Sequence, residues 1–265
     1  AINNSLTAEH IVNISGILNG TTNYILTRMR NDNCDYKEAL EEAMRLGYAE
    51  KDPTADVEGY DACRKIAILT SLALKKYVDF KDIHTEGITK VTVEDFKYAK
   101  QLESDIKLLG MSNIGDKVEA MVSTFLVKNT HPLYSVNDVF NAVNVRGDML
   151  GDAMFYGAGA GKLPTASAVV ADVIECLRHK DENLLMDWSD EKVSLNSFEN
   201  INNSFLIRVG NGDKDNVSKV FAGAKELDEV VENETGFVVD SISEASFAEG
   251  CAKLSDVKGY IRILK

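Results

Sequence analysis

The order in which helical and strand-like hydrophobic patterns follow one another constrains the fold of this chain more than any other feature of its sequence. An apolar run at 11–18 indicates a strand, and amphipathic helices are predicted over 35–46 and 59–74. Three further strands are predicted, at 118–127, 139–145 and 147–156. Because the helices and strands do not alternate as a βαβ fold requires, we expect an α+β fold with an open, mixed or antiparallel sheet covered by helices.

Two more helices are predicted from end signals and apolar spacing. Thr92 and Asp95 form a capping-box pattern that opens a helix, and the helical spacing continues as far as Leu109 through Phe96, Ala99, Leu102 and Ile106. Pro164 suits the first turn of a later helix. That helix carries one apolar ridge, formed by Val169, Val170, Val173, Ile174 and Leu177.

A change of composition near residue 190 predicts two domains. Residues 188–204 are rich in Ser, Asn, Asp and Glu and have no periodicity, which is typical of a linker. Beyond it, strands are predicted at 205–209, 227–231, 236–240 and 259–264, and helices at 216–224 and 243–254. This β-α-β-β-α-β order is that of a ferredoxin-like module. We therefore expect a large domain over 1–190 and a small one over 200–265.

The composition excludes several classes of partner. The 265 residues are 45% hydrophobic and 27% charged, as in a folded protein. A net charge of −13 argues against nucleic acid or an anionic membrane as the partner. No apolar run could span a bilayer, and the first residues lack a secretory signal pattern. The four cysteines and four histidines are scattered, so we expect reduced thiols in a cytoplasmic protein and no metal site.

The densest group of polar residues lies between positions 46 and 65. Asp61 and Lys65 are four residues apart near the start of a predicted helix, so they share one face of it. Glu50 and Asp56 lie on the preceding loop, which can fold over the same helix end. Carboxylates around a lysine could clamp a substrate ammonium group while the lysine handles an oxygen. On spacing alone, an ordinary exposed ion pair explains the pattern equally well.

Two other segments have features of ligand-binding loops. Gly157, Gly159 and Gly161 precede a predicted helix, where a backbone without side chains could approach a ligand closely. The spacing fits neither a Walker A loop nor a dinucleotide fingerprint, and a tight structural turn would also explain it. The segment 16–24 could bind a carboxylate or an amide, or could simply be a capped helix start.

Taken together and in order, these motifs resemble the catalytic domain of homoserine dehydrogenase. The resemblance covers roughly residues 11–178 and rests on GILNGTTNYILT, LGYAEKDPTADVEGYDACRK, HPL with NAV, and FYGAGAGKLPTASAVVAD. It implies the reversible, NAD- or NADP-dependent oxidation of homoserine to aspartate 4-semialdehyde, a step of threonine and methionine biosynthesis. Residues 200–265 resemble an ACT-type regulatory module. Its first loop, 210–216, lacks the usual Pro-Gly, which leaves open whether an amino-acid effector binds there.

The resemblance also implies a role for each matching residue. Lys65 matches the catalytic lysine, usually assigned as proton donor, and Asp61 and Glu50 match carboxylates that hold the substrate amino group and orient that lysine. Asp56 matches a nearby supporting acid. The positions that match the substrate lining are Gly20, Thr21 and Tyr48. Those that match the nicotinamide end of the cofactor site are Gly47, Gly157, Gly159 and Gly161.

Members of this family begin with a Rossmann domain and a metal-binding segment that have no counterpart in this sequence. We therefore expect most of the dinucleotide site, a further active-site lysine and a monovalent cation site to lie outside it, and the chain alone to fold without turning over. A homodimer or larger homo-oligomer is expected, because a second copy would cover an exposed sheet face. The alternatives are a non-catalytic, amino-acid-binding and self-associating module, and an oligomerisation scaffold.

Overall fold

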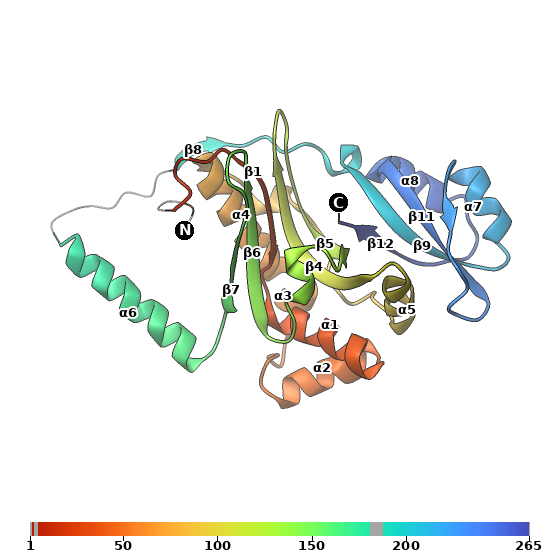
Figure 1. Ribbon diagram of the computed structural model, residues 1–265, viewed down its shortest axis with the longest axis horizontal. Coiled ribbons are helices and arrows are strands. Elements are labelled where there is room, and N and C mark those ends of the chain that lie inside the picture. The colour runs from red at the N-terminus through yellow and green to blue at the C-terminus, as the bar shows by residue number, and fades with distance from the viewer. Residues whose placement is uncertain (1, 3–4, 181–187, 265) are drawn as a thin grey trace.

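One ten-stranded sheet runs through the whole computed structural model, which describes residues 2, 5–180 and 188–264 (Figure 1). Its strands are β1 (Ile11–Ile17), β3 (His84–Thr85), β4 (Ser104–Ile114), β5 (Val118–Lys128), β6 (Phe140–Gly147), β7 (Gly151–Ala158), β9 (Asn202–Gly210), β10 (Lys225–Glu226), β11 (Glu234–Ser243) and β12 (Val257–Ile263). They follow the order β10-β11-β9-β12-β5-β4-β1-β6-β7, with β3 paired to β5 off this path. The pairs β12–β5 and β3–β5 are parallel and the other pairs antiparallel, so the predicted α+β fold with a mixed sheet is confirmed.

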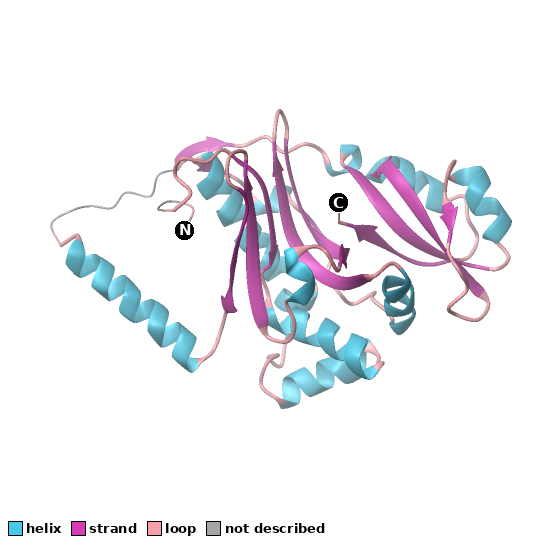
Figure 2. Ribbon diagram, viewed as in Figure 1, coloured by secondary structure: helices cyan, strands magenta, loops and turns pink. Residues whose placement is uncertain are grey.

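Helices surround this sheet in the described part of the chain, with α6 (Lys162–Arg178) standing apart from it, as Figure 2 shows. The others are α1 (Gly20–Asp32), α2 (Tyr36–Arg45), α3 (Thr54–Val57), α4 (Tyr60–Leu74), α5 (Val93–Gln101), α7 (Lys214–Val220) and α8 (Glu244–Cys251). Short 3-10 turns lie at Phe80–Asp82, Pro132–Ser135 and Phe198–Asn200. The helix predicted over 35–46 is confirmed as α2, which Asp35 caps and Gly47 follows with a φ of +78°. The predicted capping box of Thr92 and Asp95 opens α5.

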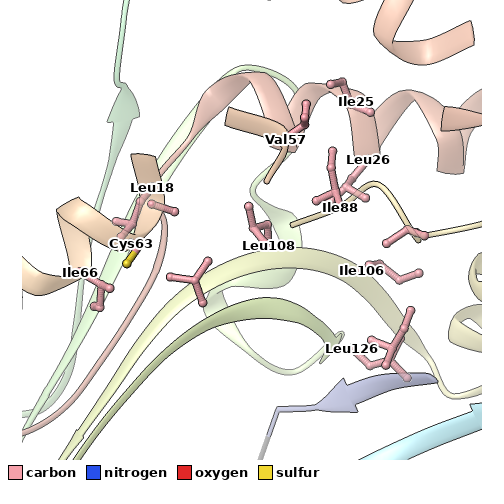
Figure 3. Packing of buried hydrophobic residues seen from close by; sticks show 14 of the residues in the cluster. Leu18, Ile25, Leu26, Val57, Cys63, Ile66, Ile88, Ile106, Leu108 and Leu126 are labelled. Atoms are coloured by element: carbon pink, nitrogen blue, oxygen red, sulfur yellow. The ribbon is translucent and has the colours of Figure 1, made fainter. Parts of the chain in front are cut away.

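The main hydrophobic core lies between the sheet and the helices α1 and α4 (Figure 3). Ile25 of α1, Ile66 of α4 and Ile106 of β4 are each fully buried in it. A second cluster contains Leu109 of β4 and Phe125 of β5. Since Ile106 and Leu109 belong to different clusters, β4 is buried on both of its faces.

The predicted extension of the α5 helix to Leu109 is wrong. The helix ends at Gln101, Glu103 takes a left-handed φ of +49°, and β4 begins at Ser104. A strand buried on both faces is apolar at odd and even positions alike, so Ile106 and Leu109 satisfied a helical spacing while lying on opposite faces of a strand.

The helix predicted after Pro164 is present as α6, but its apolar ridge is exposed. Val169, Val170, Val173, Ile174 and Leu177 keep between 45% and 69% of their surface accessible. In Figure 1 the helix stands apart from the sheet and is reached through β7. Nothing within the described parts of the chain covers this ridge.

The C-terminal segment has the predicted β-α-β-β-α-β order, with two differences. The strand predicted at 227–231 is replaced by β10 at Lys225–Glu226, and α7 ends at Val220. The predicted linker also contains β8 (Ser189–Lys192), which pairs in parallel with β2 (Lys76–Tyr77). The four residues of β8 are all polar, so their sequence carries no alternating hydrophobic pattern that would have predicted a strand paired with the distant β2.

Two buried arginines join the C-terminal segment to the rest of the molecule. Arg208 of β9 bonds Asp95 of α5 at 2.7 Å and Glu234 of β11 at 2.7 Å. Arg262 of β12 bonds Glu86 and Glu244, each at 2.6 Å. Because both guanidinium groups are almost fully buried, each depends on its carboxylates for charge compensation.

Candidate active site

A cavity of about 520 Å³ lies where the segments around α1, α2 and α4 meet the loop between β7 and α6. Its lining residues are Asn19, Gly20, Thr21, Leu46, Gly47, Tyr48, Glu50, Asp56, Asp61, Lys65, Val139, Asn141, Gly159, Ala160 and Gly161. The three polar segments singled out in the sequence therefore converge on one cavity. Of the predicted site residues, Gly157 alone does not line it, because it lies within β7, paired with Asn141 of β6.

The ammonium group of Lys65 has two partners at the edge of the cavity. Its Nζ lies 2.6 Å from Oδ2 of Asp61 and donates to the carbonyl oxygen of Leu18 at 2.9 Å. An ammonium group has three N–H bonds, so these partners leave one for a ligand. The side chains of Lys65 and Asp61 are 46% and 31% exposed, so the pair adds little to stability but remains accessible from the cavity.

Asn19 connects the start of α1 to the carboxylates of the cavity. Its Oδ1 accepts a hydrogen bond from the backbone N–H of Thr22 at 2.9 Å, which caps the helix. Its Nδ2 donates to Asp56 Oδ1 at 2.7 Å and to Asp61 Oδ2 at 3.0 Å. The capped helix start considered for the segment 16–24 is therefore present, and the amide of Asn19 provides the cap.

The loop after α2 is held against the start of α1. Thr21 donates through Oγ1 to the carbonyl oxygen of Tyr48 at 2.7 Å, and the rings of Tyr48 and Tyr24 lie 4.8 Å apart. Burial raises the pKa of the Tyr24 phenol above its ordinary value. These contacts place Tyr48 and Glu50 at the cavity next to the residues of α4.

The glycine loop closes the cavity from the side of β6 and β7. A Cβ atom at Gly159 would lie 2.5 Å from Nδ2 of Asn141, so a side chain cannot be placed there without displacing that amide. The backbone of this loop can therefore face the cavity directly. The Oδ1 atom of Asn141 is buried and has no hydrogen-bond partner in the part of the chain that the structure describes.

Several residues that line the cavity were not predicted from the sequence. Asn19 carries a recognisable signal, since a polar residue between an apolar strand and a helix is a typical N-cap. Asn141 carries none, because its place in the cavity depends on pairing between β6 and β7. Val139, which directly precedes β6, lines the cavity for the same topological reason, whereas Ala160 lies between the predicted Gly159 and Gly161.

A larger hollow of about 690 Å³ lies between residues 81–84 and 192–199. Three of its charged residues are paired among themselves or with close neighbours: Lys192 bonds Asp79 and Asp82, and His84 bonds Glu86. The cavity around Lys65 is therefore the better candidate site. Among the described residues, three or more His, Cys, Asp or Glu side chains nowhere come together as a metal site would require, and no helix is long and apolar enough to cross a membrane.

Comparison with known protein families shows to which family this chain belongs. The model of the family described as homoserine dehydrogenase matches residues 1–174. The chain belongs to the homoserine dehydrogenase family. The homoserine dehydrogenase of Bacillus subtilis is 45% identical over 175 residues, which are 66% of this chain and 40% of that protein. That of Synechocystis is 50% identical over 191 residues, or 69% of this chain and 44% of that protein. The chain thus spans less than half the length of these two homoserine dehydrogenases.

Solved homoserine dehydrogenase structures match the fold. That from Thiobacillus denitrificans superposes with a TM-score of 0.88 at 33% identity, covering 100% of this chain and 67% of that one. A hyperthermophilic archaeal homoserine dehydrogenase in complex with NADPH has a TM-score of 0.56 at 29% identity, covering 68% of this chain and 51% of that one. Membership of the homoserine dehydrogenase family does not favour the alternatives of a non-catalytic module or an oligomerisation scaffold.

Proposed function

We propose that this chain carries the substrate site and the proton donor of a homoserine dehydrogenase, which interconverts L-homoserine and L-aspartate 4-semialdehyde with NAD or NADP. The observation that supports this is the position of Lys65. Its ammonium group contacts Asp61 and the Leu18 carbonyl oxygen at the edge of a cavity that Glu50 and Asp56 also line. An amino-acid substrate needs carboxylates for its ammonium group and a proton donor at its reacting oxygen, and this cavity holds both.

In this proposal each polar group of the cavity has one task. Glu50 and Asp61 bind the substrate ammonium group, and Asp56 supports them. In the reductive direction, negative charge develops on the aldehyde oxygen, and the free N–H bond of Lys65 stabilises this charge and then transfers its proton. In the oxidative direction, the neutral amine takes the proton back from the hydroxyl group. Thr21 and Tyr48 fix the position of the substrate carbon chain.

The glycine loop and Gly47 fit the nicotinamide end of the dinucleotide. Gly47, Gly159 and Gly161 line the cavity without side chains, so a flat ring could lie against them and face the substrate. The dinucleotide, when bound, supplies or accepts the hydride. Gly157 lies within β7 rather than in the loop and does not line the cavity, so it would contribute only through the course of the backbone.

We further propose that the chain works as a homo-oligomer with two functional parts. Residues 1–190 would bind substrate and a second copy, and residues 200–265 would form an ACT-like regulatory module with room for an amino-acid effector. The support for a second copy is β7, the last strand of the sheet, where Met154, Phe155 and Tyr156 are 41–56% exposed. An edge strand with exposed apolar side chains is a typical site of self-association.

The decisive experiment replaces Lys65 by alanine in the protein at its full natural length. We expect the rate of dinucleotide oxidation with aspartate 4-semialdehyde to fall by about 100-fold or more, because positioned proton donors contribute about 10²–10⁴-fold. Lys117→Ala, at the exposed tip of the β4–β5 hairpin, is the matched control and keeps its rate. Near-normal turnover of Lys65→Ala would overturn the proposed role of this residue.

A further inference from the structure

Asn19 lies next to both residues that contact the ammonium group of Lys65, namely Leu18 and Asp61. It is 7% exposed, between the last residues of β1 and the first turn of α1. The preceding residue, Leu18, offers its carbonyl oxygen to Nζ of Lys65 at 2.9 Å. The side chain of Asn19 binds Asp61, which is the other partner of Lys65. Two consecutive residues of one turn thus determine both contacts of the lysine.

The amide of Asn19 also lets two carboxylates lie side by side. One nitrogen, Nδ2, is within 3.0 Å of an oxygen of Asp56 and of an oxygen of Asp61. Two carboxylates this close repel each other, and a donor shared between them offsets part of that repulsion. The amide cannot turn over, because Oδ1 is occupied by the N–H of Thr22 and would otherwise face the carboxylates.

We propose that Asn19 is a positioning residue of the active site: its shared amide N–H₂ group holds Asp56 and Asp61 in the arrangement that aims Lys65 into the cavity. This inference rests on the proposed function and extends it to a residue that does not itself touch the reacting atoms. The helix cap and the hold on the carboxylates use different atoms of the same amide. Substitutions can therefore separate the two roles.

Asn19→Asp and Asn19→Ala make that separation in the full natural-length protein. Aspartate is isosteric with asparagine and caps a helix about equally well, but its ionised carboxylate cannot donate to Asp56 or Asp61. Alanine loses both the cap and the donor. We expect both variants to lower kcat by about 10- to 100-fold, as a small misplacement of a catalytic group does. Both should also lower the melting temperature, Asn19→Ala because it loses the cap and Asn19→Asp because a third carboxylate lies beside Asp56 and Asp61, so kcat is measured where each variant is fully folded.

A pH profile supplies a readout that a purely structural role would not move. The titratable groups lining the same cavity are Tyr48, Glu50, Asp56, Asp61 and Lys65. As the pH falls, the carboxyl group introduced by Asn19→Asp is protonated and regains an O–H donor. The ratio of its rate to that of the unmodified protein should therefore rise toward acidic pH, while the ratio for Asn19→Ala should stay flat.

The outcomes distinguish this inference from the proposed function. Ser243→Ala, which removes the cap of α8, controls for loss of a helix cap and should leave kcat unchanged. Unmodified kcat in Asn19→Asp, with a fall only in Asn19→Ala, would show that Asn19 acts as a helix cap alone and would overturn the inference. If Lys65→Ala is also fully active, the proposed function itself fails. If Asn19→Ala does not fold, Asn19→Asp still decides.

Discussion

Glu86 shows how the surroundings of a single side chain affect the stability of this fold. Its burial disfavours the charged form, but hydrogen bonds from His84 and Arg262 outweigh that effect and hold its pKa well below the usual range of a glutamate. A carboxylate with a depressed pKa stabilises the folded state above its unfolded pKa, near 4.5, and this contribution is lost as the pH falls below that value.

We therefore expect the free energy of unfolding to fall as the pH is lowered from about 5 to about 2, and to fall less steeply in Glu86→Gln. Urea unfolding at a series of pH values measures both slopes. Glu41→Gln, at an exposed position on α2, is the control and should follow the unmodified protein. Equal slopes in Glu86→Gln and the unmodified protein would contradict this account.

The residues of the candidate site differ in how far the sequence could predict their place. The Asp61–Lys65 pair follows from helical spacing, because residues four apart always share a face. The motif match added Glu50, Asp56 and the glycine loop as members of one site. No local pattern could place Asn141 in the same cavity, since it arrives there through strand pairing between β6 and β7.

At the scale of whole elements, β4 and α6 show what periodicity leaves undecided. Apolar spacing wrongly predicted a helix across β4, because both faces of that strand are buried. The same kind of spacing correctly predicted α6, but it could not indicate which part of the molecule, if any, covers the apolar ridge of that helix. A hydrophobic pattern reports which side chains avoid water but not which neighbour provides the cover. The ridge of α6 and the edge strand β7 are apolar surfaces that this leaves exposed.

We predict that β7 is the element through which two copies associate. A lysine at Phe155, which is 42% exposed, would place a charge within an apolar interface, so Phe155→Lys should weaken self-association by 10-fold or more in dissociation constant without unfolding the chain. Sedimentation velocity over a concentration series measures this. Ile68→Lys, at a 50% exposed position of α4, is the matched control. Equal association of both variants would rule out β7 as the interface.

At the scale of the whole molecule, a single sheet connects two parts that the sequence predicted as separate domains. Strand β12 of the C-terminal segment pairs with β5 at Phe125 and Leu126, and the Arg208 and Arg262 networks cross the same junction. Each arginine has one carboxylate partner within its own segment and one across the junction, and buried charges that are compensated in part from across a junction make its two sides depend on each other. We therefore expect the two parts to unfold together.

Arg262→Met tests this coupling. The arginine side chain is 2% exposed, and its removal would leave Glu86 and Glu244 without their main partner, so we expect a loss of about 3–5 kcal/mol in urea unfolding. Arg146→Met breaks an ion pair whose side chains are 53% and 35% exposed and should cost about 0.2–1 kcal/mol. Equal losses in the two variants would mean that the Arg262 network does not hold the junction.

The sequence by itself determined the features that depend on neighbours within a few residues. These are the capped ends of α2 and α5, the shared helix face of Asp61 and Lys65, the order of elements in the C-terminal segment, and the motifs of the homoserine dehydrogenase family. Only the tertiary structure decided that β4 is a strand, that β8 pairs across the predicted linker, that Asn19 joins two carboxylates, and that one sheet passes through both parts. The physical reason is that each of these depends on contacts between segments far apart in the chain. The local pattern reports which side chains avoid water, but not which distant segment they pack against or pair with.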